Sequence, residues 1–191
     1  MAVRDELLRI IQDDARVGNV VNFGSAYGWL EHEVASKVPR LRVWGLDRSK
    51  RAMNLNRREF RSGNCSFGAG DIHEFIEGNH SALEKSIFCH VNVGVYFLPE
   101  FMKQSYHAVF RAGALYVVLF EPSGLSRQTG DFYRYSMEVR DSVVFRGPMI
   151  LHNYPNLLRK SGYEVIKASL HAPPHPHKDF RSVEFTARRK S

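Results

Sequence analysis

The sequence predicts an α/β protein: a doubly wound, mostly parallel seven-stranded sheet with helices on both faces and an antiparallel C-terminal hairpin. Apolar strand patterns alternate with helical patterns from Asn19 onward, and strands that are apolar throughout are typical of a parallel sheet covered on both faces. The last two strands, 163–169 and 182–188, have only a loop between them, so they should pair antiparallel. With 43% hydrophobic and 25% charged residues, the 191-residue chain is expected to form one domain, 1–191.

Each element has its own signal in the sequence. A short N-terminal cap, 1–18, carries an apolar stripe on a helix over 4–13, and Pro39 stops a second helix. Pro99 begins a long helix that Gly113 closes. The expected order after the cap is strand 19–23, helix 27–38, strand 42–46, helix 49–61, strand 65–68, a brief helix 80–84, strand 87–93, helix 99–112, strand 114–120, an insertion over 122–150, helix 154–161, strand 163–169 and strand 182–188.

A turn of small residues follows the first strand, in Asn22-Phe23-Gly24-Ser25-Ala26-Tyr27-Gly28. Gly or Ala at alternate positions lets the backbone pass close to a ligand, and the helix that follows points free N–H groups at it. The spacing departs from the dinucleotide fingerprint G-x-G-x-x-G, whose third glycine would fall on Trp29. The stretch therefore predicts a nucleotide cradle, while its spacing and the terminal hairpin disfavour a nicotinamide oxidoreductase.

Acidic residues follow the second and third strands. Asp47, about 20 residues beyond the loop, is placed to chelate a ribose diol. Asp71, in Gly-Asp-Ile, is placed to read an adenine edge together with the N–H that follows it. Because ligands of such sheets bind at the carboxyl ends of the strands, we expect Gly24, Asp47, Asp71 and the end of strand 87–93 to lie together.

With these motifs the chain resembles the class I S-adenosylmethionine-dependent methyltransferases from Asn19 to Arg189. The family's first motif, acid-x-G-x-G-x-G, matches 22–28, its ribose-binding acid falls on Asp47, and its fourth-strand motif falls on 90–93. The resemblance implies the Rossmann-like methyltransferase fold, S-adenosylmethionine as cofactor and S-adenosylhomocysteine as product. The implied cofactor-binding residues are Asn22, Gly24, Ser25, Ala26, Tyr27, Gly28, Asp47, Arg48, Asp71, Ile72 and Asn92.

Two positions depart from the family pattern. Asn22 stands where the family has an acid, and Ala26 stands where it has the middle glycine. Asn22 can form hydrogen bonds but carries no charge to help hold the methionine ammonium group. A non-catalytic relative that serves as a partner subunit is therefore an alternative, and the presence of Asp47 and Asp71 opposes it.

The chemistry requires mainly that acceptor, methyl group and sulfur be aligned, because the sulfonium already activates the methyl group. A hydroxyl acceptor also needs a base whose pKa lies near the working pH. His152, at the entry of helix 154–161, is the first candidate base, with a helix-capping or surface histidine as its structural alternative. Glu121 is a second candidate base or substrate ligand, and Tyr96 could orient the substrate or simply pack. His90 lies within an apolar run and is expected to be a core histidine.

The acceptor class is inferred from two stretches. The end of the fourth strand, Asn92-Val93-Gly94-Val95, lacks the Asn/Asp-Pro-Pro-Tyr/Phe signature of enzymes that methylate amide or base nitrogens. Asn92 also departs from the lysine–aspartate–lysine–glutamate set of ribose 2′-O-methyltransferases. The insertion mixes aromatic residues with arginines, which suits a lid over a polar or anionic small molecule and equally suits a homodimer interface. These residues are Phe132, Tyr133, Tyr135, Met137, Phe145, Arg127, Arg134, Arg140 and Arg146. We therefore expect transfer to an oxygen, in preference to a nitrogen, of a small molecule.

The net charge of +7 supports a rival function, an RNA methyltransferase. Cations gather on or beside helix 49–61 and at the C-terminal tail, at Arg48, Lys50, Arg51, Arg57, Arg58, Arg61, Arg188, Arg189 and Lys190. This rival predicts salt-dependent RNA binding. A solvated helix on the outside of a sheet has the same composition.

The remaining features indicate the cellular setting. His171, His175 and His177 have no cysteine or carboxylate at a recognisable metal-ligand spacing, so no metal site is expected. Cys65 and Cys89 lie in or beside apolar stretches and are interpreted as buried thiols of a reducing compartment. The N-terminus lacks the layout of a signal peptide, and no apolar run approaches about 20 residues. We expect a cytoplasmic protein that does not enter the membrane.

Overall fold

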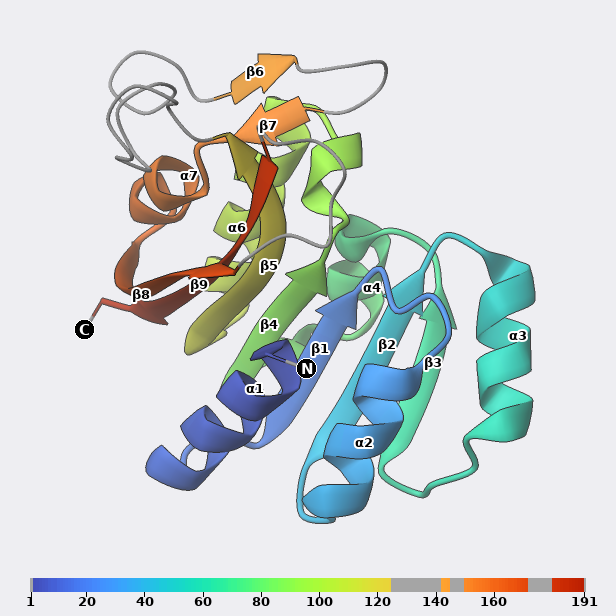
Figure 1. Cartoon of the computed structure of the whole chain (residues 1–191). Coiled ribbons are helices and arrows are strands. Elements are labelled where there is room, and N and C mark those ends of the chain that lie inside the picture. Colours follow the sequence, from blue (N-terminus) through green and yellow to red (C-terminus); the bar gives the residue numbers. More distant parts are fainter. Residues whose placement is uncertain (1, 125–141, 145–149, 172–179, 191) are drawn as a thin grey trace.

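A computed structural model describes residues 2–124, 142–144, 150–171 and 180–190. Its centre is a seven-stranded sheet in the order β3-β2-β1-β4-β5-β9-β8. The strands are β1 (Asn19–Phe23), β2 (Arg42–Asp47), β3 (Cys65–Ala69), β4 (Ser86–Val91), β5 (Tyr116–Gly124), β8 (Tyr163–His171) and β9 (Phe180–Arg189). The first five strands of this order are parallel, and β9 pairs antiparallel with both β5 and β8. The predicted doubly wound sheet with a C-terminal hairpin is thus confirmed (Figure 1).

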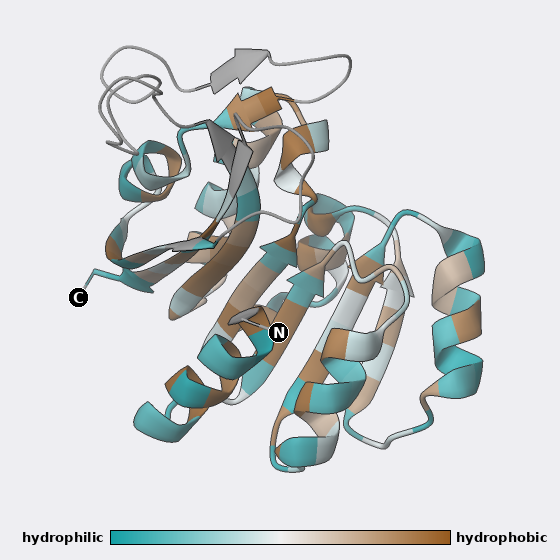
Figure 2. Cartoon of the chain, viewed as in Figure 1, coloured by the Kyte–Doolittle hydropathy of each residue, from teal (hydrophilic) through white to brown (hydrophobic). Residues whose placement is uncertain are grey.

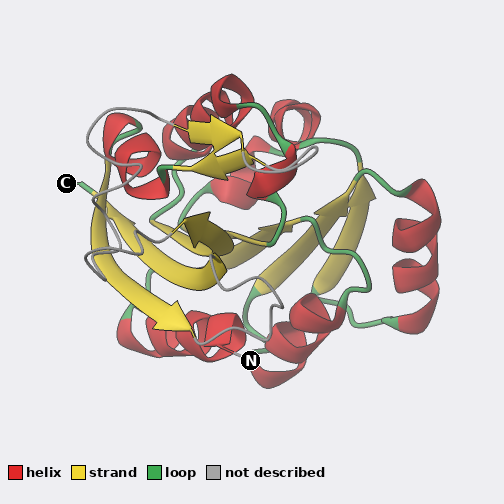
Figure 3. Cartoon of the chain, turned by 45° about the horizontal axis from the view of Figure 1, so that its top comes forward, coloured by secondary structure: helices red, strands yellow, loops and turns green. Residues whose placement is uncertain are grey.

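Helices cover both faces of the sheet (Figure 3). The helices are α1 (Ala2–Asp13), α2 (Trp29–Lys37), α3 (Lys50–Glu59), α4 (Ile72–Gly78), α5 (His80–Leu83), α6 (Pro99–Arg111) and α7 (Tyr154–Lys160). Successive side chains of each strand point to opposite faces of the sheet, so there are two hydrophobic cores, one on each face. Val20 packs with α1, α2 and α3, whereas Val21 packs with α4 to α7. Figure 2 shows hydrophobic residues concentrated in the strands, with hydrophilic residues on the outer helix surfaces.

Helix α1 is held to the sheet by a buried ionic cluster as well as by apolar packing. Glu6 is 4% exposed, accepts a hydrogen bond from Thr186 at 2.7 Å, and pairs with Lys167 at 2.7 Å and Arg9 at 2.8 Å. Lys167 also pairs with buried Glu184 at 2.6 Å. These bonds lower the pKa of Glu6 to about 2, against the effect of burial, so the N-terminal helix is tied to β8 and β9 by charge.

Several boundaries differ from the prediction. Strand β4 ends at Val91 because Asn92 adopts a left-handed conformation with φ of 55°. The strand predicted over 114–120 begins at Tyr116 and continues to Gly124, so the insertion starts later than expected. Helix α4 was not predicted, and it forms because Asp71 and Glu74 make a capping box.

A second, two-stranded sheet was also not predicted. Strands β6 (Ser142–Val144) and β7 (Ile150–His152) pair antiparallel, and β7 lies against the 3-10 turn η1 (Gly94–Tyr96) and against β5. Residues 125–141 and 145–149 of the insertion, which include all of its aromatic and arginine residues named above, lie outside the described residues. Within the described ranges, no helix is long and apolar enough to cross a membrane.

Candidate functional site

The loop after β1 has the backbone geometry of a close-approach turn. Gly24 and Gly28 have φ of 85° and 72°, and Ala26 has φ of 46°. The amides of Gly24 and Ser25 both donate to the carbonyl of Leu46, which ties the loop to β2. A Cβ at position 24 would lie 2.0 Å from Val93 Cγ2, so only glycine lets the loops after β1 and β4 meet.

Asp47 ends β2 and holds this loop from the side. Its Oδ2 accepts from the Ala26 amide at 3.0 Å, and its Oδ1 accepts from the Ser49 amide at 2.9 Å. A carboxylate has about four acceptor positions, so these two bonds leave room for hydroxyl groups of a ligand. The next residue, Arg48, places its guanidinium 5.1 Å from the ring centroid of Phe97, which follows β4. The ends of β2 and β4 therefore meet across the carboxyl end of β1, where the ligand was expected.

Asp71 is primarily a helix cap. Its Oδ1 accepts from the amides of His73 at 2.8 Å and Glu74 at 3.0 Å. The Ile72 side chain is fully buried in the core, so only the backbone N–H of this residue is available to a ligand. Ile72 is the first residue of α4, and its N–H therefore has no partner within the helix. Both residues lie at the carboxyl end of β3, as predicted. The Asp71 side chain also stabilises the start of α4 through its two hydrogen bonds to backbone amides.

Asn22 has no direct access to solvent. It is 4% exposed, donates to Glu31 Oε1 at 2.8 Å, and its Oδ1 lies 3.6 Å from the Cys89 thiol. Its side chain points toward α2 because it shares the strand face of Val20. Glu31 is thus a buried acid beside the position where the sequence lacks one, and the sequence analysis missed it.

Glu121 lies at the carboxyl end of β5 and is fully buried. Its Oε1 accepts from His90 Nδ1 at 2.5 Å and from the amides of Val93 at 2.9 Å and Gly94 at 3.1 Å. The other ring nitrogen of His90 is 2.8 Å from the Tyr106 hydroxyl, which confirms the expected core histidine. Glu121 therefore clamps the turn after β4 to β5, and this contact suits a positioning residue better than a base.

His152 ends β7 and is 2% exposed. Its Nε2 lies 3.0 Å from the Gly94 carbonyl and 3.1 Å from the Phe97 carbonyl. Carbonyl oxygens only accept, so Nε2 carries the proton and Nδ1 has a free lone pair. Nδ1 has no hydrogen-bond partner among the described residues, and burial lowers the pKa of His152, which keeps the ring neutral.

The three predicted catalytic residues meet around one turn, η1. Glu121 holds its amides, His152 binds its carbonyls, and Tyr96 belongs to it. The Tyr96 ring is 63% exposed and so does not pack in the core. Tyr27, on the loop after β1, is 71% exposed. Aromatic rings therefore border the carboxyl edge on two neighbouring loops.

Tyr154 of α7 is a further buried residue of this region that the sequence analysis missed. A Cβ at position 94 would lie 2.4 Å from its hydroxyl, so Gly94 is required for the close approach. Burial, together with the nearby Glu121, raises the pKa of Tyr154 well above its usual range. The aromatic side chain alone did not distinguish this contact from ordinary core packing.

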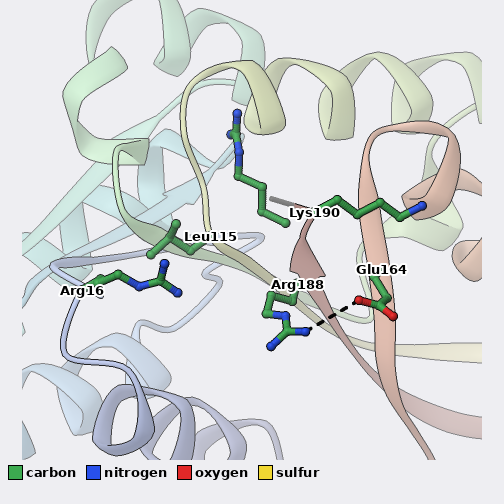
Figure 4. Close-up of a pocket in the computed structure, with 6 residues that line it drawn as sticks. Arg16, Leu115, Glu164, Arg188 and Lys190 are labelled. Atoms are coloured by element: carbon green, nitrogen blue, oxygen red, sulfur yellow. Dashed lines mark ion pairs between the residues drawn. The ribbon is translucent and has the colours of Figure 1, made fainter.

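The basic tail lies at the other edge of the sheet. A cavity of about 820 Å³ is lined by Arg16, Leu115, Glu164, Arg188, Arg189 and Lys190, near the amino end of β5 (Figure 4). Arg188 pairs with Glu164 at 3.7 Å, and Arg16 pairs with Asp14 at 2.6 Å. The basic helix α3 lies against β3, at the opposite side of the sheet from β8 (Figure 1). The cations thus divide between separate surfaces.

The histidines considered as metal ligands lie at or just after the end of β8 in the sequence. The described residues contain no group of three metal-ligating side chains, and His175 and His177 lie outside them. His171 ends β8 and lies 3.6 Å from Glu184. Cys65 and Cys89 are buried free thiols, as expected.

Comparisons with known proteins agree with this geometry. No protein-family model and no curated protein sequence matches the chain. Among solved structures, a magnesium protoporphyrin IX methyltransferase from Synechocystis with bound S-adenosylhomocysteine has a TM-score of 0.68 at 13% identity, over 99% of this chain and 82% of the other.

Two further structures give the same result. An O-methyltransferase of a polyketide synthase multienzyme from Brevibacillus brevis has a TM-score of 0.68 at 10% identity, over 98% of this chain and 72% of the other. A methyltransferase from Methanosarcina mazei has a TM-score of 0.63 at 15% identity, over 94% and 96%. The chain has the fold of the S-adenosylmethionine-dependent methyltransferases.

Proposed function

We propose that this protein is an enzyme that transfers a methyl group from S-adenosylmethionine to an oxygen of a small-molecule acceptor. The observation that carries the proposal is the joint placement, at one edge of the sheet, of a glycine cradle and a neutral histidine whose Nδ1 has no hydrogen-bond partner in the described part of the chain. S-adenosylmethionine would supply a methyl group activated by its sulfonium and would leave as S-adenosylhomocysteine.

The residues present fit this cofactor. Gly24 and Gly28 give a loop that only glycine permits at these φ angles and contacts. Asp47 retains acceptor capacity for ribose hydroxyls, and the first amide of α4, at Ile72, faces the same edge from the end of β3. Arg48 and Asn92 border the same loops from the ends of β2 and β4.

His152 is the proposed base. Two carbonyls fix the tautomer, so Nδ1 can take the proton of an acceptor hydroxyl as the oxygen–methyl bond forms. Nδ1 is buried, so acceptor binding must open a path to it. Glu121 positions the turn that holds Nε2, and Tyr96 offers an exposed ring to the acceptor.

The division of the basic residues favours a small molecule over RNA. A polyanion on the tail cavity would lie at the amino edge of the sheet, away from the proposed transfer site. The likeness to an O-methyltransferase supports an oxygen acceptor. Buried free thiols at Cys65 and Cys89 support our expectation of a cytoplasmic location.

Transfer of a labelled methyl group tests the proposal. The protein would be incubated with methyl-labelled S-adenosylmethionine and panels of phenols, hydroxy acids, sugars and, separately, RNA. We expect transfer to a hydroxyl compound, which His152→Gln lowers about 10²- to 10⁴-fold without changing cofactor affinity. His107→Gln, an exposed histidine of α6, is the matched control. Transfer to RNA alone, or equal rates for His152→Gln and the control, would contradict the assignment.

A further inference from the structure

Glu31 is a buried acid that the proposed mechanism does not use. It is 1% exposed and lies in the first turn of α2. A Glu at the third position of a helix commonly reaches back to the N-cap amide. Here the Gly28 amide donates to the Ser25 carbonyl instead, and Glu31 turns inward to accept from Asn22 at 2.8 Å.

The Glu31 carboxyl group lies directly beneath the glycine loop. A Cβ at position 45 would be 2.6 Å from Ser25 Oγ and 2.8 Å from Glu31 Oε1, so these two groups lie side by side against Gly45. Ser25 and Gly28 are buried on the inner side of the loop, whereas Ala26 and Tyr27 are exposed. Only the thickness of the loop therefore separates the carboxyl group from the exposed surface of the cradle.

One oxygen of this group, Oε2, is buried with no hydrogen-bond partner among the described residues. Among the residues that the structure describes, Asp47, Cys65 and Cys89 interact electrostatically with Glu31, and none of these three carries positive charge. Burial is the main cause that raises the pKa of Glu31. A buried carboxyl group with no cation nearby favours its neutral form, because ionising it there costs free energy. A positive charge that binds close to it lowers this cost, so the group then ionises more readily.

We propose that Glu31 supplies the negative charge that position 22 lacks, and that its ionisation is coupled to binding of the positively charged cofactor. The inference rests on the proposed function. On binding, the protonated fraction of Glu31 loses its proton to solvent, and the resulting carboxylate lies beneath the loop that would hold the cofactor. Asn22 holds that carboxylate in place through its amide.

This coupling discriminates between two ligands that differ by a single charge. S-adenosylmethionine carries a sulfonium, whereas S-adenosylhomocysteine has a neutral thioether. Two opposite charges roughly 10 Å apart, at an effective dielectric constant of about 20, attract one another by an energy that corresponds to about a tenfold change in affinity. Glu31 thus favours substrate over product. This preference increases as the pH rises toward the pKa of Glu31 in the free protein and is constant above it, where Glu31 is already ionised before binding.

Calorimetric titration of both ligands tests the inference, with S-adenosylmethionine and S-adenosylhomocysteine as the probes. We expect Glu31→Gln to reduce the preference for S-adenosylmethionine about tenfold and to abolish its pH dependence. Glu33→Gln, which removes the same charge from the same helix where Glu33 pairs with Arg4, should change neither. Asn22→Asp combined with Glu31→Gln returns the charge to position 22 and should restore the preference.

A second readout does not depend on binding preference or on the variants folding. Infrared spectra of the wild-type protein should contain a protonated carboxyl band that shrinks when S-adenosylmethionine is added. Titration in buffers of different ionisation enthalpy should report net release of at most about half a proton, the maximum that a tenfold coupling produces. A preference unchanged by Glu31→Gln, or a wild-type band that does not respond to S-adenosylmethionine, overturns the inference and leaves the proposed function intact. Binding of neither ligand instead overturns the proposed function.

Discussion

Replacing Glu121 by alanine tests how the turn after β4 is held. The substitution removes the single oxygen that accepts from His90 Nδ1, the Val93 amide and the Gly94 amide. All three donors lie at or near the carboxyl end of β4; His90 and Gly94 are buried, Val93 is half-buried, and Glu121 itself is fully buried. The free energy of unfolding should therefore fall because three donors lose their acceptor together.

The size of the effect follows from these contacts. An unsatisfied buried donor costs about 1–3 kcal/mol, so loss of the shared acceptor by three donors sets an upper range of about 3–9 kcal/mol. Removal of the carboxylate also relieves its own desolvation cost, so the three donors do not add in full. We predict a loss of about 4 kcal/mol for Glu121→Ala. Glu121→Gln retains an acceptor oxygen at the same place and should lose about 1–2 kcal/mol.

Urea unfolding followed by circular dichroism measures both losses, and Glu77→Ala, at an exposed position of α4, is the matched control. Because the Gly94 and Phe97 carbonyls also hold His152, the proposed base, we expect Glu121→Ala to lower the rate of methyl transfer as well. If the free energy of unfolding of Glu121→Ala were within about 1 kcal/mol of the wild-type value, at least two of the donors would have found other partners, and Glu121 would not be what holds this turn.

Two further predictions concern the loop and the N-terminal helix. Gly24→Ala should destabilise the protein by about 2–4 kcal/mol, since it places a Cβ 2.0 Å from Val93 Cγ2 at positive φ, whereas Gly63→Ala, with open space around it, should change little in the same urea experiment. A comparable loss in both variants would contradict this account. Glu6 has a folded-state pKa of about 2, below its ordinary value of 4.5, so it contributes about 3 kcal/mol above pH 4.5 that is lost as the pH falls toward 2. The stability difference between wild type and Glu6→Gln should shrink over that window, and a difference independent of pH would exclude the role of this charge.

The fold was predictable because local pattern and tertiary structure agree. The alternation of apolar strands with helices, and the missing helix before the last strand, determined the sheet and its C-terminal hairpin. Helix α4 was missed although its capping pair, Asp71 and Glu74, is visible in the sequence, because Asp71 was interpreted only as a ligand-binding acid. Strands β6 and β7 are three residues each, too short for a periodic signal.

The candidate site was predictable in its backbone and less so in its side chains. Gly24, Gly28 and Asp47 lie where their positions after β1 and β2 imply. The Asn22–Glu31 pair depends on which strand face meets α2, and the His90–Glu121 pair depends on how β4 and β5 are aligned. The strand face that meets α2 and the alignment of β4 with β5 are both set by tertiary packing, so the sequence pattern alone did not identify either pair.

The central claim is that this fold binds S-adenosylmethionine at the carboxyl edge of β1 and β2. Calorimetric titration of the wild type, Asp47→Ala and Glu77→Ala with S-adenosylmethionine and S-adenosylhomocysteine tests it most directly. Asp47 holds the loop through the Ala26 amide, whereas Glu77 is exposed on α4. We predict micromolar binding of both ligands to the wild type and Glu77→Ala, and none to Asp47→Ala. A wild-type protein that binds neither ligand, or an Asp47→Ala protein that binds both equally well, would contradict the account.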